Sequence, residues 1–177
     1  SMASVIGTRI GWKNMETNVV WPGRSLDRID WSGAELVLSA AHNSESLSHD
    51  LGRLGPEKHV LVVGMTQKED LLESIEPLLH SEGRIRTIVT EVHGGRSPSV
   101  PAEHLSDHLS LESEEPPLII TEPIEAIDTA SRMASEKGSI VYVTGSVYLV
   151  GQAIEKIVSR EEGDLWDYLE AHPPRVG

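Results

Sequence analysis

Short apolar runs recur along this chain and are separated by segments of about helical length. They lie at residues 35–38, 59–63, 84–92, 118–121 and 139–143. Strands that alternate with helices form βα units, and parallel strands need such crossover connections. The pattern therefore predicts an α/β fold, a Rossmann-like three-layer domain with a mainly parallel five- or six-stranded sheet.

Helices are predicted in the intervening segments, at residues 44–54, 66–79, 101–109, 124–135 and 147–159. The second of these is expected to start with Thr66 as its cap, because Glu69 stands three residues later and completes a capping box. Residues 25–31 alternate in polarity, which indicates a short edge strand before the regular part.

The length of 177 residues indicates one domain with a substantial core. We place this domain at residues 21–160. Residues 1–20 are expected to be a linker or N-terminal extension, and residues 161–177 an acidic tail.

Composition excludes several classes of partner. The chain has 15 Lys and Arg against 28 Asp and Glu, a net charge of −13 at pH 7. Nucleic acids and anionic membranes attract basic proteins, so neither is an expected partner, although a local basic pocket for a small anion remains possible. No cysteine is present, which excludes disulfides and thiolate metal sites. No apolar run approaches the roughly 18–20 residues of a membrane helix, and we expect a cytoplasmic protein.

Known phosphate-binding sequences are absent. The chain has neither the glycine-rich dinucleotide fingerprint nor the phosphate loop of nucleotide-hydrolysing enzymes, so it has no self-sufficient nucleoside triphosphate cradle. His104 and His108 have the four-residue spacing of metal ligands on a helix. No third ligand accompanies them, so we favour a solvated helix face there and predict no metal site.

The segment after the first apolar run contains candidate functional residues. It ends in small residues, followed by His42 and Asn43 and a predicted helix start. Ligands of open α/β sheets bind at the carboxyl ends of strands, so His42 is a candidate for a ligand-binding crevice. Asn43 is expected to cap the helix that follows.

Three segments taken in order resemble one family. They read WPGR at 21–24, LSAAHN at 38–43 and VYVTGSVYLVG at 141–151. Together they resemble the C-terminal domain of folylpolyglutamate synthase / dihydrofolate synthase, of the Mur ligase superfamily. The segment VVGM at 62–65, with the charged residues 68–70 after it, is similar to that family's second strand.

The resemblance implies a ligase that joins glutamate to a folate carboxylate with ATP, through an acyl phosphate that the glutamate amine attacks. It implies that ATP and Mg are bound mainly by an N-terminal ATPase domain, together with most of the folate site. A chain like this one would then be inactive alone and would contribute nucleotide and glutamate contacts. Its partners would be that N-terminal domain and the glutamate and folate substrates.

The resemblance also implies roles for single residues. Arg24 is expected to contact the nucleotide, since a guanidinium after a rigid turn grips phosphate well. His42 is expected at the nucleotide and glutamate sites, as the catalytic candidate. Ser146 is expected to bind a glutamate carboxylate, and it serves equally well as a helix cap. Two further residues are weaker candidates on their position alone: Lys68, near a helix start, for the substrate, and Arg96, in a loop, for a polyglutamate tail or the partner domain. An ordinary solvated side chain explains each of them better.

Ser39 departs from the family pattern, which has an aspartate able to accept both ribose hydroxyls. It is still counted among the nucleotide-binding residues. Loss of a buried, charged contact that nothing replaces costs on the order of 1.5–3 kcal/mol. Another carboxylate could substitute, or the chain could be a stand-alone, non-catalytic α/β module that binds a small anion or a protein partner.

Overall fold

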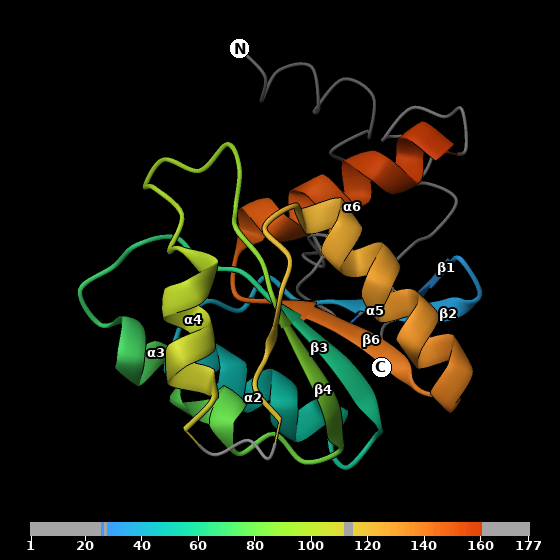
Figure 1. Ribbon diagram of the computed structural model, residues 1–177, viewed down its shortest axis with the longest axis horizontal. Coiled ribbons are helices and arrows are strands. Elements are labelled where there is room, and N and C mark those ends of the chain that lie inside the picture. The colour runs from blue at the N-terminus through green and yellow to red at the C-terminus, as the bar shows by residue number, and fades with distance from the viewer. Residues whose placement is uncertain (1–25, 27, 112–114, 161–177) are drawn as a thin grey trace, which may run out of the picture.

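The computed structural model describes residues 26, 28–111 and 115–160. Its strands are β1 (Arg28–Trp31), β2 (Ala34–Leu38), β3 (His59–Val63), β4 (Arg84–Val89), β5 (Leu118–Ile119) and β6 (Ile140–Thr144). They form one six-stranded sheet in the order β1-β2-β6-β3-β4-β5 (Figure 1). Only β1 is antiparallel to its neighbour, which confirms the predicted edge strand and the mainly parallel sheet.

Helices cover both faces of the sheet. They are α2 (Ser44–Leu54), α3 (Leu71–Leu79), α4 (Ala102–Leu109), α5 (Pro123–Lys137) and α6 (Val147–Arg160). Helices α2, α3 and α4 pack on one face, and α5 and α6 pack on the other (Figure 1). This arrangement confirms the three-layer, Rossmann-like α/β fold. In the part of the chain that the structure describes, no helix has the length and apolarity needed to span a bilayer.

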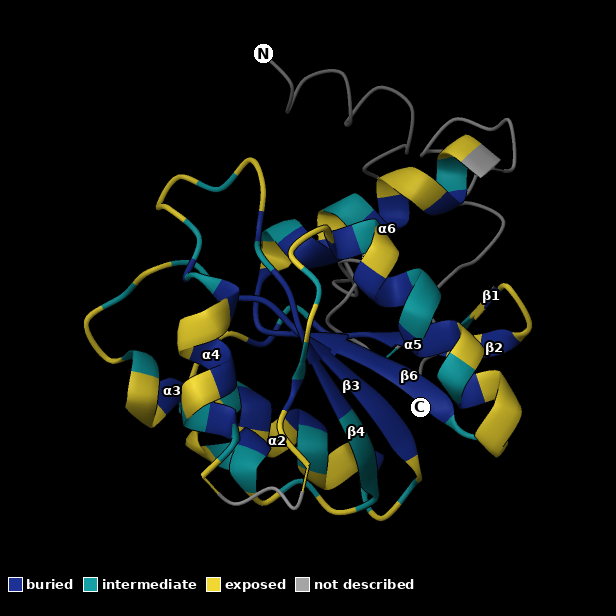
Figure 2. Cartoon of the chain, viewed as in Figure 1, coloured by how far each residue is buried: buried dark blue, intermediate teal, exposed yellow. Residues whose placement is uncertain are grey.

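The central strands are buried on both sides, as their unbroken apolar sequences predict (Figure 2). In β3, Val60 and Val62 belong to the core under α5 and α6, while Leu61 and Val63 belong to the core under α2, α3 and α4. Burying a valine or leucine side chain fully contributes about 1.5–3 kcal/mol relative to leaving it exposed. The sheet therefore holds both helix layers.

Strand order brings three carboxyl ends together. β6 lies between β2 and β3, with Leu38 opposite Val143 and Val63 opposite Thr144. The chain leaves β2 toward α2 on one face and leaves β6 toward α6 on the other. Such a divergence between neighbouring strands is where open α/β sheets bind their ligands.

The start of α3 corrects one prediction. The helix begins at Leu71 with Asp70 as its N-cap residue, and no side chain caps it. Thr66 instead forms an isolated bridge with Ser99, so the capping box predicted from Thr66 and Glu69 is wrong. Because of this bridge, the backbone of Thr66 is paired with a distant residue and does not start a helix. The sequence around Thr66 does not predict such a pairing.

The ends of two strands also differ from the sequence prediction. β4 ends at Val89 rather than at residue 92, and β5 is only two residues long. The predicted domain limits at residues 20/21 and 160/161 adjoin residues outside the described ones, so those limits stay predictions.

Candidate functional site

Three loops meet where β2, β6 and β3 end. We call them the strand-end cluster: residues 39–43 after β2, residues 64–68 after β3, and residues 145–148 after β6. The Gly145 amide donates to the Ala41 carbonyl oxygen at 3.0 Å, which ties the first loop to the third. Gly145 has φ +100°, and a Cβ there would lie 2.7 Å from the Gly64 carbonyl oxygen. Only glycine fits this close approach of two loops.

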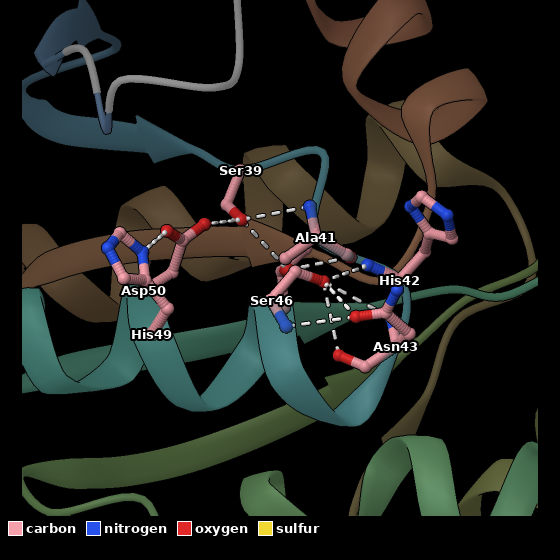
Figure 3. A network of polar contacts seen from close by, with 8 residues as sticks. Ser39, Ala41, His42, Asn43, Ser46, His49 and Asp50 are labelled. Atoms are coloured by element: carbon pink, nitrogen blue, oxygen red, sulfur yellow. Dashed lines mark hydrogen bonds and ion pairs between the residues drawn. The ribbon is translucent and has the colours of Figure 1, made fainter.

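His42 is an exposed residue of the cluster. Its Nδ1 lies 2.9 Å from the Ala40 carbonyl oxygen. A carbonyl oxygen can only accept, so Nδ1 carries a proton and the neutral ring keeps Nε2 as an acceptor. Among the described residues nothing bonds to Nε2, which leaves that atom for a ligand (Figure 3).

Lys68 brings a positive charge to the same loop. Its Nζ donates to the His42 carbonyl oxygen at 2.9 Å and lies 3.5 Å from Asp70 Oδ1. The side chain keeps 22% of its exposure, so the ammonium is partly fixed and still reachable by an anion. The structure therefore joins two candidates, His42 and Lys68, which lie 26 residues apart in the sequence.

Asn43 caps helix α2, as predicted. Its Oδ1 accepts from the Ser46 amide at 2.9 Å and from the Ser46 hydroxyl at 2.7 Å. The Ser46 hydroxyl also accepts from the His42 amide at 3.2 Å. The Asn43 side chain is thus engaged in the capping box of α2, and the Ser46 hydroxyl holds the His42 amide.

Ser39 is completely buried at the end of β2, and its hydroxyl donates to Asp50 Oδ2 of helix α2 at 2.6 Å (Figure 3). The same oxygen accepts from the Ala41 amide at 3.1 Å. The Thr144 hydroxyl lies 3.3 Å from both Ser39 Oγ and the Ala41 carbonyl oxygen. A buried polar network therefore underlies the loop that carries His42.

Tyr142 of β6 places a phenol near this network. The residue is fully buried, and its hydroxyl has no hydrogen-bond partner among the described residues. Burial raises the pKa of Tyr142, the nearby Ser39 and Thr144 hydroxyls act against this, and the negative charge of Asp50 adds to it. The phenol therefore stays neutral at physiological pH.

Ser146 is buried at the start of α6, with 3% exposure. Its hydroxyl accepts from the Tyr148 amide at 3.2 Å, which is the helix-capping role. The predicted contact with a glutamate carboxylate stays a prediction.

The remaining candidates lie in different places. Arg24 is outside the described residues. Arg96 is exposed in the loop after β4. A Cβ on its neighbour Gly95 would lie 3.1 Å from Thr66 Cγ2 and 3.5 Å from Tyr148 Cδ2, so this loop passes beside the strand-end cluster.

Sequence reasoning missed Asp50, Tyr142 and Thr144. Asp50 had a usable signal, because it stands on the apolar face of α2 with Leu47 and Leu54, where a charge needs a partner. Tyr142 and Thr144 lie in the segment 141–151 that resembles the family, but nothing in it marks either as part of a buried polar network.

Other features of the structure lie apart from this cluster. His104 and His108 both stand on α4, and no group of three or more His, Asp or Glu residues among those described could hold a metal ion. A cavity of about 320 Å³ opens between α3 and α4, lined by Leu72, Glu73, Ile75, Glu76, Leu79, His108 and Leu111. None of the residues of the strand-end cluster lines it.

No protein-family model matches the sequence, and no curated protein matches it. Solved structures do share its fold. A structure of E. coli FolC in complex with ADP, without folate substrate, is 22% identical, covers 83% of this chain and 34% of that chain, and has a TM-score of 0.65. Folylpolyglutamate synthase from Thermotoga maritima is 24% identical over 85% of this chain and 34% of that chain, with a TM-score of 0.63.

A third similar structure is the bifunctional folylpolyglutamate synthase/dihydrofolate synthase of Yersinia pestis, complexed with AMPPNP and Mn ion. It is 22% identical, covers 78% of this chain and 32% of that chain, and has a TM-score of 0.61. The chain spans about a third of the length of each of these structures. Its fold is consistent with the C-terminal domain indicated by the sequence resemblance.

Proposed function

We propose that this chain is the C-terminal domain of an ATP-dependent ligase that adds glutamate to folates. It contributes nucleotide and glutamate contacts and is inactive without an N-terminal ATPase domain. Two independent lines support the proposal: the three sequence segments that resemble the family, and a fold shared with folylpolyglutamate synthases over about four fifths of the chain. The proposed ligase would work in the cytoplasm, with which a chain without cysteine is compatible.

The observation that carries the proposal is the presentation of His42. Its Nδ1 is held by the Ala40 carbonyl oxygen, its ring is exposed, and the Lys68 ammonium binds the carbonyl oxygen of the same residue. The Lys68 ammonium on the main chain of His42 suits an anionic ligand, even on a chain with a net charge of −13, and the acceptor Nε2 suits a group that donates a proton. The phosphate groups of ADP and the carboxylates of glutamate are both anionic.

In the proposed reaction, His42 accepts a proton from the glutamate amine. The glutamate amine attacks the acyl phosphate, a C–N bond forms, and the C–O bond to phosphate breaks. The attacking amine must first lose a proton from its ammonium form, and the acceptor Nε2 of His42 would take it. Ser146 and the start of α6 would hold a glutamate carboxylate, with the Ser146 hydroxyl shared with the Tyr148 amide.

Arg24, Ser39 and His42 are proposed to take part in nucleotide binding, Arg24 and His42 by direct contact. Because Ser39 is buried and its hydroxyl is bonded to Asp50, its contribution is through the loop that it holds. ATP and Mg would be bound mainly by the N-terminal domain. The described residues offer no group of three metal-ligating side chains, so we assign no metal ligand and no step to a metal in this part of the chain.

Complementation tests this proposal. The chain is mixed with the separately produced N-terminal ATPase domain of the same ligase, and ADP formation is followed with ATP, glutamate and a folate substrate. We expect no activity from either part alone and glutamate-dependent activity from the mixture. His42→Ala should remove most of it, whereas His80→Ala, at the opposite end of the strands, should not.

An inactive mixture would contradict the ligase role. In that case the second function, a non-catalytic module for a small anion or a protein partner, takes its place. The observation that favours this alternative is Ser39 itself, where a buried hydroxyl stands in place of the ribose-binding aspartate that the resemblance expects.

A further inference from the structure

Asp50 is a buried carboxylate without a role in the proposed reaction. It has 8% exposure and stands on the face of α2 that packs against the sheet, between the buried residues Leu47 and Leu54. Burying a carboxylate is costly unless hydrogen bonds compensate for the lost water. Its surroundings must therefore supply those bonds.

The bonds that Asp50 makes fix the direction of a hydroxyl. Ser39 has a single hydroxyl proton, and it is given to Asp50 Oδ2 at 2.6 Å. The lone pairs of Ser39 Oγ are then left to accept, and the Ala41 amide donates to them at 3.1 Å. The carboxylate thus selects the one hydroxyl orientation in which Ser39 accepts from the loop backbone.

This chain of bonds ends at the exposed histidine. The Ala41 amide and carbonyl are both held, the first by Ser39 and the second by Gly145 and Thr144. His42 follows Ala41 directly, so these hydrogen bonds fix the position of the His42 backbone. The other oxygen, Asp50 Oδ1, lies 3.2 Å from Nδ1 of the exposed His49, which places that end of the carboxylate near the surface.

We propose that Asp50 is a positioning residue for the strand-end cluster. Its carboxylate reaches the end of β2 from helix α2, holds Ser39, and through Ser39 fixes the loop that presents His42. The ligand part of this inference rests on the proposed function; the positioning part does not. In this arrangement the Asp50 carboxylate orients the Ser39 hydroxyl, and the Ser39 hydroxyl binds the Ala41 amide at the end of β2.

Hydrogen exchange tests the positioning directly. Asp50→Leu removes the carboxylate at similar volume, and Asp50→Asn keeps one oxygen that accepts from Ser39. The double variant Ser39→Asp/Asp50→Ser exchanges the two ends of the bond. Asp107→Leu, at an exposed position of α4, is the matched control. The readout is the exchange rate of the Ala41 amide relative to the amides of β3.

We expect Asp50→Leu to speed exchange at Ala41 about tenfold relative to β3, the equivalent of one lost hydrogen bond of about 1.4 kcal/mol. Asp50→Asn and the exchanged pair should stay within about threefold of the starting protein. A general loss of stability would speed both sets of amides, so the ratio separates positioning from a purely structural role. If Asp50→Leu does not fold, Ser39→Ala removes the same link and should give the same ratio.

An Ala41 amide that exchanges in step with β3, or not faster at all, in both Asp50→Leu and Ser39→Ala would overturn the inference. The affinity for ADP and for L-glutamate, measured by calorimetry, then links positioning to function: we expect it to fall about tenfold in Asp50→Leu and to recover in the exchanged pair. If the Ala41 ratio changes as expected while the unmodified chain and its N-terminal domain neither bind nor react, the proposed function fails and the positioning role stands.

Discussion

The Lys68 ammonium donates a hydrogen bond of 2.9 Å to the main-chain carbonyl oxygen of His42. This contact joins the segment after β3 to the segment after β2, across the end of β6 that lies between them. Lys68 also lies 3.5 Å from Asp70 Oδ1, an exposed carboxylate that offsets part of its charge and leaves the rest available to an anion. The bond therefore places a cation on the main chain of the residue whose imidazole is exposed.

Replacing Lys68 with methionine should weaken anion binding more than it weakens the fold. We expect the affinity for ADP to fall about tenfold or less, since a partly exposed ammonium contributes a charge-assisted bond of modest strength. The free energy of unfolding should fall by less than about 1 kcal/mol. Calorimetric titration and urea unfolding measure the two quantities. Lys137→Met, in the last turn of α5, provides the comparison, and equal loss of affinity in both variants would refute a local role for Lys68.

His59 should make stability depend on pH. Burial lowers the pKa of His59 below its ordinary value of 6.5, and the Glu57 carbonyl oxygen opposes this only in part. Above pH 6.5 both folded and unfolded chains carry neutral His59. As the pH falls through 6.5 toward the folded pKa, the unfolded chain takes up a proton that the folded chain refuses, and stability is lost.

Urea unfolding at a series of pH values between about 7.5 and 5 measures this loss. His59→Gln keeps a polar side chain without the titration and should reduce the slope of the unfolding free energy against pH. An unchanged slope in that variant would show that other groups cause the dependence.

Gly145 should not tolerate a side chain. Its φ of +100° is strained for any other residue, and a Cβ would meet the Gly64 carbonyl oxygen and Met65 Cγ. We expect Gly145→Ala to cost about 2 kcal/mol or more. Gly151→Ala in α6, where a Cβ meets nothing within 4 Å, should instead stabilise the helix by about 0.5–1 kcal/mol. Thermal unfolding of the two variants tests the contrast, and a stable Gly145→Ala protein would argue against the close approach of these loops.

Tyr142→Phe should be nearly neutral or slightly stabilising. The variant keeps the ring, including its edge contact with His59 at 5.9 Å between centroids, and removes a buried hydroxyl that has no partner among the described residues. An unsatisfied polar group contributes nothing favourable, so its removal is expected to change the unfolding free energy by less than about 1 kcal/mol. A larger loss would mean that the phenol bonds to Ser39, Thr144 or Asp50 in solution.

Much of the fold was predictable because the spacing of apolar residues along the sequence shows which positions are buried. The continuous apolar run of β3 and the helix of residues 44–54 are set by local sequence, and both were predicted with the bounds that the structure gives. The start of α3 was not, because Thr66 pairs with Ser99, more than thirty residues away. A pairing at that distance leaves no trace in the sequence around residue 66.

The site was predictable in part for the same reason. His42 and Asn43 follow a strand and precede a helix, and the structure places both where that pattern indicates. Ser39 was recognised as unusual, but its partner on α2 lies eleven residues later and depends on how α2 packs against β2 and β6. The meeting of Lys68 with His42 likewise depends on strand order, which apolar runs alone do not specify.

The most direct test of the central claim is a nuclear magnetic resonance titration of the labelled chain with ADP and, separately, with L-glutamate. If the strand-end cluster binds these ligands, backbone amide shifts will concentrate in residues 39–43, 64–68 and 145–148, and the His42 ring signals will move with them. The His42→Ala variant should lose most of the response. Absence of shifts at millimolar ligand, or shifts confined to the cavity between α3 and α4, would contradict the account.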